Sequence, residues 1–113
     1  MKIVNRKEFL AMPAGTVYSK YTPFIFDDLS IKGDTWSNDF LCQSLSDAFW
    51  WLSSEEYIEG LQRAENAGES LVMDFDCESR DGLFDEQQLF AVWERSDVEG
   101  LIARLQLALK AQG

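Results

Sequence analysis

The sequence contains no histidine and only two cysteines, Cys42 and Cys77, among its 113 residues. Histidine is the usual general base at neutral pH and a common metal ligand. Its absence therefore excludes catalytic groups built on Ser–His–Asp or Cys–His pairs. Twenty carboxylates remain for acid–base work, but in so short a chain neighbouring pairs arise by chance. We expect a protein that is not an enzyme and that uses no cofactor.

Long apolar runs are also missing. No stretch approaches the ~20 apolar residues that a membrane-spanning helix needs. The first residues, MKIVNRKEFLAMPAG, carry charges where a signal peptide has an apolar segment. Two cysteines in a small chain are typical of free thiols in a reducing compartment, and a disulfide between them is the alternative. We expect a cytoplasmic protein with no membrane contact.

Basic residues are scarce: ten lysines and arginines stand against twenty aspartates and glutamates, for a net charge of -10. Binding to nucleic acid needs several converging cations, and a net negative field repels a polyanion. We therefore expect no direct contact with nucleic acid. The negative charge is concentrated, because half of the carboxylates lie between Glu69 and Glu99, where only Arg80 and Arg95 oppose them.

Hydrophobic residues make up 46% of the chain and aromatic residues 13%. This composition excludes a disordered acidic tail, because such tails are poor in aromatic residues. The length suits a single domain spanning residues 1–113.

Local patterns in the first third predict strands at residues 2–4, 16–21 and 24–31, with a turn at residues 32–34 and a short strand around Trp36. Asn5 followed by Glu8 has the spacing of a helix cap and its reciprocal partner, and Pro13 ends the turn of helix that they begin.

Two helices are predicted next. Leu41, Leu45 and Leu52 recur at helical spacing and predict a helix over residues 40–52, with Asp39 as its cap. A second helix begins at residues 53–54 and ends at Gly68. The short connection favours antiparallel packing of the two helices.

The last third predicts a hairpin and a helix. Residues 71–78 alternate between apolar and mostly acidic side chains, which is typical of a strand, and residues 88–94 read as its partner after a turn at residues 80–82. Ser96 and Glu99 form a capping box before the final helix. Its inward positions are Val98, Leu101, Ile102, Leu105, Ala108 and Leu109. The predicted class is α+β: an antiparallel sheet of about four or five strands, with about three helices packed on one face.

An outward acidic face follows from the predicted strand, because Asp74, Asp76 and Glu78 would project about 7 Å apart along one side of it. Such a row can imitate phosphate charges and occupy a nucleic-acid-binding groove. The alternative is that the acidity only keeps the protein soluble. The candidate partner-binding carboxylates are Asp74, Asp76, Glu78, Asp81, Asp85 and Glu86.

The same segment also resembles the start of a calcium loop, Asp74-x-Asp76-x-Glu78. An EF-hand loop needs glycine at its sixth position and glutamate at its twelfth, and here those positions hold Ser79 and Asp85. Strand alternation explains the spacing without an ion. We expect no metal site.

Aromatic exposure supplies the second cue for an interaction. On the predicted helix, Trp50 lies opposite the leucine stripe with Trp51 on its flank, and Leu107 lies opposite the stripe of the last helix. Tryptophan is enriched at interface hot spots. If exposed, Trp50 is a candidate anchor, and these residues together would mark a protein contact or a homodimer seam. Burial between helices packed on two sides is the alternative.

Two segments, KIVNRKEFLAMPAGTVYSKYTP and RDGLFDEQQLFAVWE, resemble a group of small acidic proteins encoded by bacteriophages and prophages, generally without an assigned function. They cover about a third of the chain and contain no catalytic motif. The resemblance implies a phage accessory protein acting in the cytoplasm of a host bacterium. We expect it to bind a basic surface of a host protein and to inhibit a nucleic-acid-handling defence complex, of the CRISPR or restriction type. The alternative is a structural or regulatory homo-oligomer with no defence role.

Overall fold

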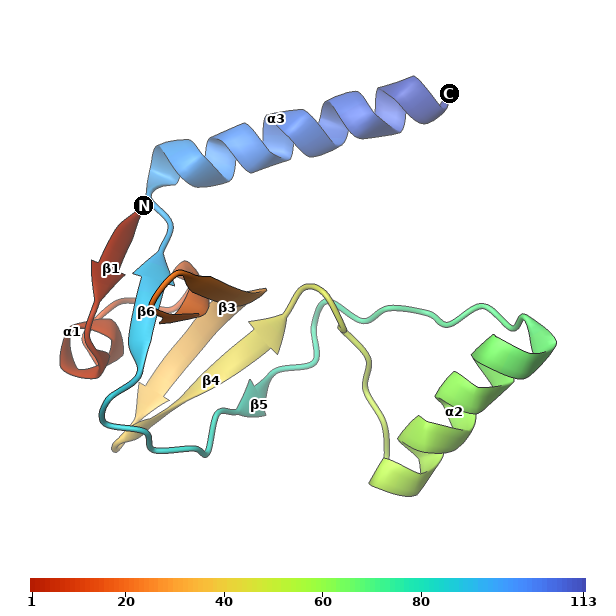
Figure 1. The fold of residues 1–113 in the computed structure, drawn as a ribbon, viewed down its shortest axis with the longest axis horizontal. Helices are drawn as coiled ribbons and strands as arrows, with labels where there is room; N and C mark the ends of the chain where they lie inside the picture. Colours follow the sequence, from red (N-terminus) through yellow and green to blue (C-terminus); the bar gives the residue numbers. More distant parts are fainter.

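The computed structural model describes residues 1–113 and shows an α+β fold with six strands and three helices (Figure 1). In chain order the elements are β1 (Lys2–Val4), α1 (Arg6–Leu10), β2 (Val17–Thr22), β3 (Ile25–Trp36), β4 (Asp39–Ser44), α2 (Ser54–Ala67), β5 (Ser79–Arg80), β6 (Leu89–Val92) and α3 (Arg95–Gln112). The strands form one antiparallel sheet in the order β1-β6-β2-β3-β4-β5. The predicted class is confirmed, and the sheet has six strands rather than four or five.

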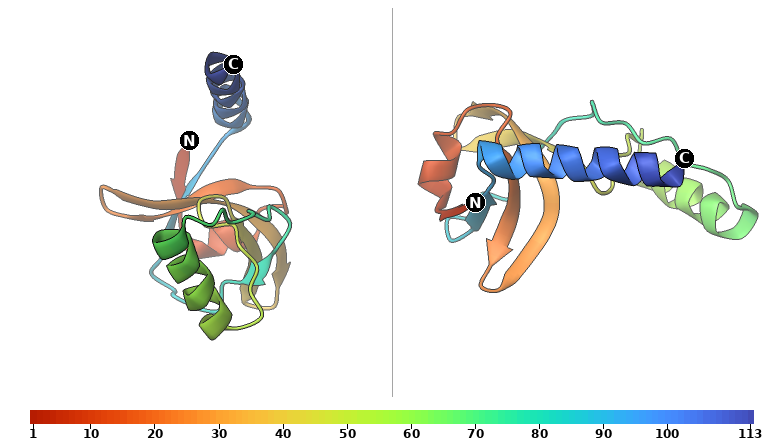
Figure 2. Two further views of the ribbon diagram at one scale, coloured as in Figure 1. Left: turned by 90° about the vertical axis from the view of Figure 1, so that its right-hand side faces the viewer. Right: turned by 90° about the horizontal axis from the view of Figure 1, so that it is seen from above.

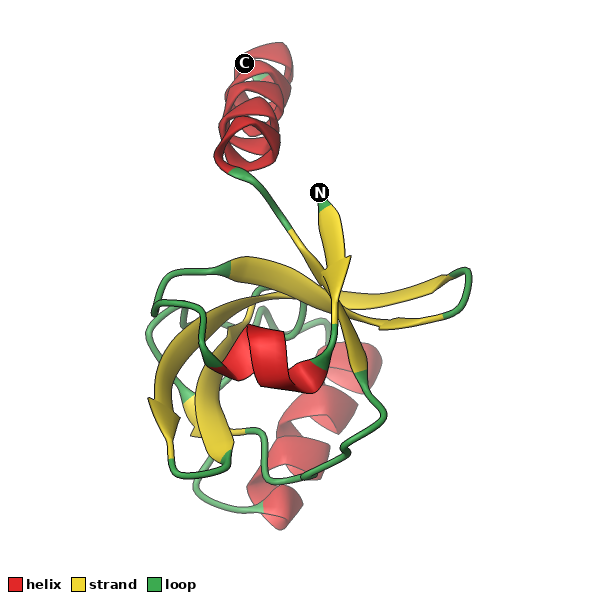
Figure 3. Cartoon of the chain, turned by 90° about the vertical axis from the view of Figure 1, so that its left-hand side faces the viewer, coloured by secondary structure: helices red, strands yellow, loops and turns green.

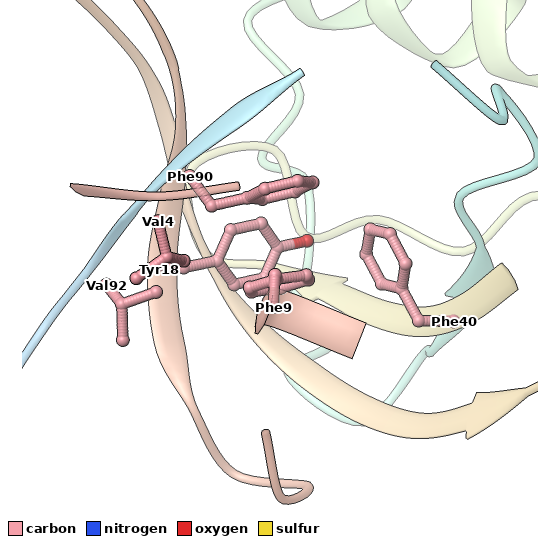
Figure 4. Close-up of a cluster of buried hydrophobic side chains, with 6 residues drawn as sticks. All are labelled: Val4, Phe9, Tyr18, Phe40, Phe90 and Val92. Atoms are coloured by element: carbon pink, nitrogen blue, oxygen red, sulfur yellow. The ribbon is translucent and has the colours of Figure 1, made fainter. Parts of the chain in front are cut away.

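The core lies where α1 crosses the curved sheet (Figure 3). Phe9 of α1 is fully buried and stacks on Phe90 of β6, with ring centroids 4.0 Å apart. It also meets Tyr18 and Phe40 edge to face, at 4.6 and 5.0 Å (Figure 4). Edge-to-face and offset pairs of aromatic rings add about 0.5–1.5 kcal/mol each beyond their buried area. Phe9 is therefore the central side chain of this small core.

Helix α1 forms where the sequence predicts it. The side chain of Asn5 accepts a hydrogen bond from the backbone N–H of Glu8 at 2.9 Å, so it satisfies one free donor at the start of the helix. The short helix is thereby set with Phe9 facing the sheet.

The other two helices do not cover one face of the sheet, and this expectation is wrong. Helix α3 stands away from the sheet and is joined to it at the end of β6 (Figures 1 and 2). None of its side chains is buried. In α2 only Gly60 is buried.

The predicted helix over residues 40–52 is also wrong, because residues 39–44 form β4 and the rest is irregular. Short apolar runs fit both periods, and here the strand period prevails: Phe40 enters the core whereas Leu52 is 77% exposed. The helix pair expected around Ser53 is therefore absent. Helix α2 itself is confirmed, with Ser53 as its N-cap and Gly68 ending it in a left-handed conformation.

The turn predicted at residues 32–34 lies inside β3, which continues past it with an irregularity in its pairing to β4. Residues 71–78 form no strand, so the predicted hairpin with residues 88–94 is wrong. Strand β6 pairs with β1 and β2 instead. The final helix begins one residue before Ser96, and its capping pair is Glu94 and Asp97, where the backbone N–H of Glu94 donates to the Asp97 carboxylate at 2.8 Å.

Asp39 is a buried carboxylate in β4 rather than a helix cap. It accepts hydrogen bonds from the backbone N–H of Gly82 at 3.0 Å and from Arg80 Nε at 2.9 Å. Burial disfavours the charged form, but the Gly82 and Phe40 amides and the Arg80 guanidinium outweigh it and hold the pKa of Asp39 below its usual value. These bonds attach β5 and the following turn to the sheet.

Candidate protein-binding surface

Residues 69–78 form an irregular connector between α2 and β5, and it carries three of the predicted carboxylates. Buried Gln43 of β4 holds the connector to the sheet: its amide nitrogen donates to the Asp74 carbonyl at 3.2 Å, and its amide oxygen accepts from the Cys77 backbone N–H at 2.5 Å. The Asp74 N–H also donates to the Ala48 carbonyl at 2.6 Å. The connector is therefore fixed in place without being a strand.

Asp74, Asp76 and Glu78 are all exposed, and none of them forms an ion pair. The Asp74 carboxylate accepts a hydrogen bond from the Asp76 backbone N–H at 2.9 Å, which orders this part of the connector. Three uncompensated negative charges thus lie within five residues of a tethered segment. The predicted exposure of these three carboxylates is confirmed.

One cleft, of about 360 Å³, lies between the connector and β3 and is lined in part by Phe75, Asp76 and Glu78. On the β3 side, Lys32 is almost fully buried and donates to the Gly33 carbonyl at 3.1 Å and to Thr35 Oγ1 at 2.7 Å. Burial lowers the pKa of the Lys32 amine. Lys32 directs its amine to these two oxygens and forms no ion pair with any of the three connector carboxylates.

A second cleft, of about 470 Å³, lies on the other side of Glu78 and is lined by aromatic rings. Phe49, Trp50, Trp51 and Tyr57 all contribute to its wall. Trp51 meets Tyr57 edge to face at 5.6 Å, whereas Trp50 is 62% exposed. The Trp51 indole N–H is buried without a hydrogen-bond partner. Glu78 therefore stands between an acidic cleft and an aromatic one.

Gly60 of α2 is the residue that lets Trp51 lie against the helix. A methyl group built at Gly60 would meet the Trp51 ring at 2.5 Å. Alanine in place of an exposed helical glycine normally stabilises a helix by about 1 kcal/mol. We predict that Gly60→Ala displaces Trp51 instead, so that acrylamide quenches tryptophan fluorescence more strongly than in the wild type. Gly100→Ala in α3, where nothing lies within 4 Å, is the matched control and should leave quenching unchanged. Equal quenching of all three proteins would contradict this role of Gly60.

Asp81 does not belong to the exposed acidic set, and its prediction as a binding residue is corrected. Its side chain is 5% exposed and accepts from Lys20 Nζ at 2.5 Å, with Arg6 Nη1 4.0 Å away. Arg6 is itself buried and donates to the Asn38 carbonyl at 2.6 Å. Asp81 is withdrawn from the surface because Arg6 and Lys20, two cations from the N-terminal part of the chain, reach its carboxylate across the sheet and enclose it.

Asp85 and Glu86 are exposed but lie apart from the connector. Glu86 accepts a long hydrogen bond of 3.4 Å from Asn38, the residue before β4, whereas the connector is held near the far end of β4 by Gln43. The length of this six-residue strand is about 17 Å. The Asp85 carboxylate accepts from the Gln87 backbone N–H at 2.9 Å. The six predicted carboxylates are thus divided among three places.

Sequence reasoning missed Phe75 and Tyr57 as surface residues. Phe75 is one of the apolar positions of the alternating pattern at residues 71–78, which predicts burial, but it is 59% exposed because the connector is irregular. Tyr57 lies in the second predicted helix, where packing against a neighbouring helix would bury it, but it is 37% exposed. Only the proximity of Trp50 in the sequence hinted at an aromatic surface here.

No three histidine, cysteine, aspartate or glutamate side chains are grouped so that they could hold a metal ion. Cys42 and Cys77 are free thiols, and burial raises the pKa of Cys42. No helix is both long enough and apolar enough to cross a membrane. Comparison with protein-family models, with curated proteins and with solved structures finds no match to this chain.

Proposed function

We propose that this protein is a non-catalytic binding protein that docks on a basic surface of another protein. The docking site is the acidic–aromatic surface, defined as Trp50, Asp74, Phe75, Asp76 and Glu78. The observation that carries the proposal is the position of Glu78, which lines both the cleft with Asp76 and Phe75 and the cleft with Trp50. Exposed charge and exposed aromatic rings therefore share one tethered segment and its neighbours.

The two kinds of side chain have different roles in this proposal. Unpaired carboxylates attract a cationic partner from a distance and orient it, which raises the association rate. Aromatic side chains that become buried in the complex slow its dissociation. Trp50 has the largest side chain of this set and is 62% exposed, so it is the proposed anchor.

Local docking fits this surface better than imitation of a long stretch of DNA. The exposed surface is 8068 Å² for twenty carboxylates. This is about 400 Å² for each charge, whereas duplex DNA carries roughly one charge per 100 Å². The exposed acidic side chains also do not form one row, because Glu86 lies near the start of β4 and the connector carboxylates lie near its far end. The proposed contact is therefore a short acidic segment inserted against a basic patch.

The class of partner is proposed from the resemblance to phage proteins. In that setting the chain acts in the cytoplasm of a host bacterium, and the basic surface belongs to a nucleic-acid-handling defence complex. Occupation of that surface would exclude the nucleic acid and inhibit the complex.

Charge reversal tests the docking surface directly. The triple substitution Asp74→Lys, Asp76→Lys and Glu78→Lys should abolish capture of a basic protein from bacterial lysate. The fold should survive, because the three side chains are exposed and the tether uses backbone groups and Gln43. The measurement is affinity purification with immobilised protein, followed by salt elution and mass spectrometry.

The matched control changes the same amount of charge elsewhere: Glu8→Lys, Asp27→Lys and Asp28→Lys, at three exposed positions. This variant should retain the captured protein. The triple substitution Asp74→Lys, Asp76→Lys and Glu78→Lys is called the connector variant below. Undiminished capture by the connector variant, or equal loss of capture in both variants, would refute the role of the acidic–aromatic surface.

A structural or regulatory homo-oligomer with no defence role is the second candidate function. Trp50 and Leu107 are 62% and 59% exposed. Their exposure favours this function, because large apolar side chains on a surface can form the seam of a homodimer. A monomer at micromolar concentration in light scattering would count against it.

A further inference from the structure

A third cleft, of about 370 Å³, lies where β3 turns into β4 and shares no lining residue with the two clefts beside Glu78. Its walls are made of two aromatic residues and four polar ones: Trp36, Ser37, Asn38, Asp39, Arg80 and Phe84. Sites for small molecules are clefts of about 300–1,000 Å³ with aromatic walls and a few fixed polar groups. The third cleft has the volume and the composition of such a site.

Arg80 of β5 is the only basic residue in this cleft, and the fold holds its guanidinium on two sides. Its Nε donates to the buried Asp39 carboxylate at 2.9 Å, and its Cζ lies 5.0 Å from the centre of the Trp36 ring. A guanidinium that is already stacked on a ring and hydrogen-bonded at one edge loses little further freedom when a ligand binds. Arg80 is therefore preorganised.

The outer fork of the Arg80 guanidinium is free. Its two terminal nitrogens, Nη1 and Nη2, donate no hydrogen bond within the protein, and Asp39 is the only ion-pair partner of Arg80. The Arg80 side chain is 53% exposed, so a ligand can reach the fork. Asp39 is held in place by the Gly82 N–H at 3.0 Å and stays on the Nε side. A guanidinium fork binds a carboxylate through two parallel hydrogen bonds, and this fork offers that geometry.

Trp36 and Phe84 supply the apolar part of the cleft. Trp36 is 63% exposed and Phe84 is 45% exposed. Phe84 has a left-handed backbone conformation, with φ at 53°. This conformation is rare and costly for a bulky residue, and residues strained in this way cluster at ligand sites. A flat ring is the ligand group that aromatic side chains bind best, because it stacks on them or meets their edges.

The charge of the cleft favours a ligand with one negative charge. Arg80 is its only cation, and the whole chain carries a net charge of -10. A phosphate monoester carries about two negative charges near neutral pH, so one of them would stay without a partner. Glu86, which accepts from Asn38 at the edge of the cleft, would repel that second charge. A carboxylate carries a single charge and matches the fork.

We propose that the third cleft binds a small planar carboxylate, such as an aromatic acid. The carboxylate of the ligand accepts two hydrogen bonds from the Arg80 fork, and its ring contacts the exposed parts of Trp36 and Phe84. The inference goes beyond the proposed docking function and does not depend on it, because the acidic–aromatic surface has none of these residues.

The first test is a titration of ¹⁵N-labelled protein with benzoate, followed by nuclear magnetic resonance. Benzoate at millimolar concentration should shift the indole N–H signal of Trp36 and the Nε–H signal of Arg80 until both saturate. The indole signals of Trp50 and Trp51 should not move and are internal controls. Acetate, which has no ring, and cyclohexanecarboxylate, whose ring is not planar, should each bind roughly tenfold more weakly.

Three results of this titration would overturn the proposal. The first is the absence of a saturable shift at Trp36 and Arg80. The second is a shift at Trp50 or Trp51 in place of Trp36. The third is acetate or phenyl phosphate binding as tightly as benzoate, because the site would then select neither a ring nor a single charge.

The second test uses variants of the cleft. Arg80→Lys keeps the charge and loses the fork, so benzoate should bind at least about tenfold more weakly. Arg95→Lys in α3 is the matched control, because that side chain is 93% exposed and lies outside the cleft, and it should bind like the wild type. Phe84→Leu changes an exposed loop residue and should weaken benzoate binding but not acetate binding. Wild-type affinity for benzoate in folded Arg80→Lys protein, or in Phe84→Leu, would refute the site.

Discussion

Replacing Phe9 with alanine is expected to remove most of the stability of the fold. Phe9 is fully buried and contacts Tyr18, Phe40 and Phe90 with its ring. Truncation of a buried phenylalanine costs about 3–5 kcal/mol, a large part of the roughly 5–15 kcal/mol that stabilises a typical domain. The loss of stability should be large in this chain, because its core cluster holds only six buried residues. Urea unfolding followed by near-ultraviolet circular dichroism measures it.

Two controls isolate the contribution of the core. Phe9→Leu keeps most of the volume, so its cost should be clearly smaller than that of alanine. Phe24→Ala removes a ring that is 92% exposed at the β2–β3 turn and should change stability by no more than about 0.5 kcal/mol. If Phe9→Ala and Phe24→Ala had the same unfolding midpoint, the position of the core would be wrong.

Replacing Asp81 with alanine is expected to destabilise the protein by about 3–5 kcal/mol, because it leaves the buried Arg6 and the half-buried Lys20 without a counterion. Asp81 receives Lys20 at 2.5 Å and lies 4.0 Å from Arg6, whose side chain is 3% exposed. Asp74→Ala is the matched control, since that carboxylate is exposed and forms no ion pair. Thermal unfolding of the two variants provides the comparison.

The same two variants distinguish a carboxylate that stabilises the fold from one that binds the partner. Asp81→Ala should lower the melting temperature, and any loss of partner capture should follow loss of fold. Asp74→Ala should lower the melting temperature far less, because it removes only one exposed hydrogen bond, from the Asp76 backbone N–H. Replacing Arg6 and Lys20 by methionine in the Asp81→Ala variant should restore part of the stability, because no unpaired charge then remains. An Asp81→Ala protein as stable as the wild type would contradict the buried pair.

The sequence predicts elements well where a local signal has one interpretation. Asn5 caps α1, Ser53 and Gly68 bound α2, and the β-branched run at residues 16–21 becomes β2. Residues 39–44 were predicted wrongly, because their apolar spacing fits a helix as well as a strand and only pairing with β3 decides between them. Residues 71–78 alternate like a strand, yet Gln43 and Ala48 bind their backbone in an irregular path.

The candidate site could be predicted only in part, for the same reason. The sequence shows how many carboxylates are close along the chain, but not which cations reach them from distant elements. Lys20 and Arg6 enclose Asp81 from sixty and more residues away, whereas Asp74, Asp76 and Glu78 stay unpaired. The exposure of Trp50 was left open by the sequence, because it depended on whether helices pack around it.

The most direct test of the acidic–aromatic surface is a titration of the captured partner at several salt concentrations, with the wild type and the connector variant side by side. Charge-driven docking predicts that the wild-type association rate falls steeply as salt rises, and that the variant binds weakly at every salt concentration. Wild-type binding that is independent of salt, or equal affinities for the two proteins, would contradict the account.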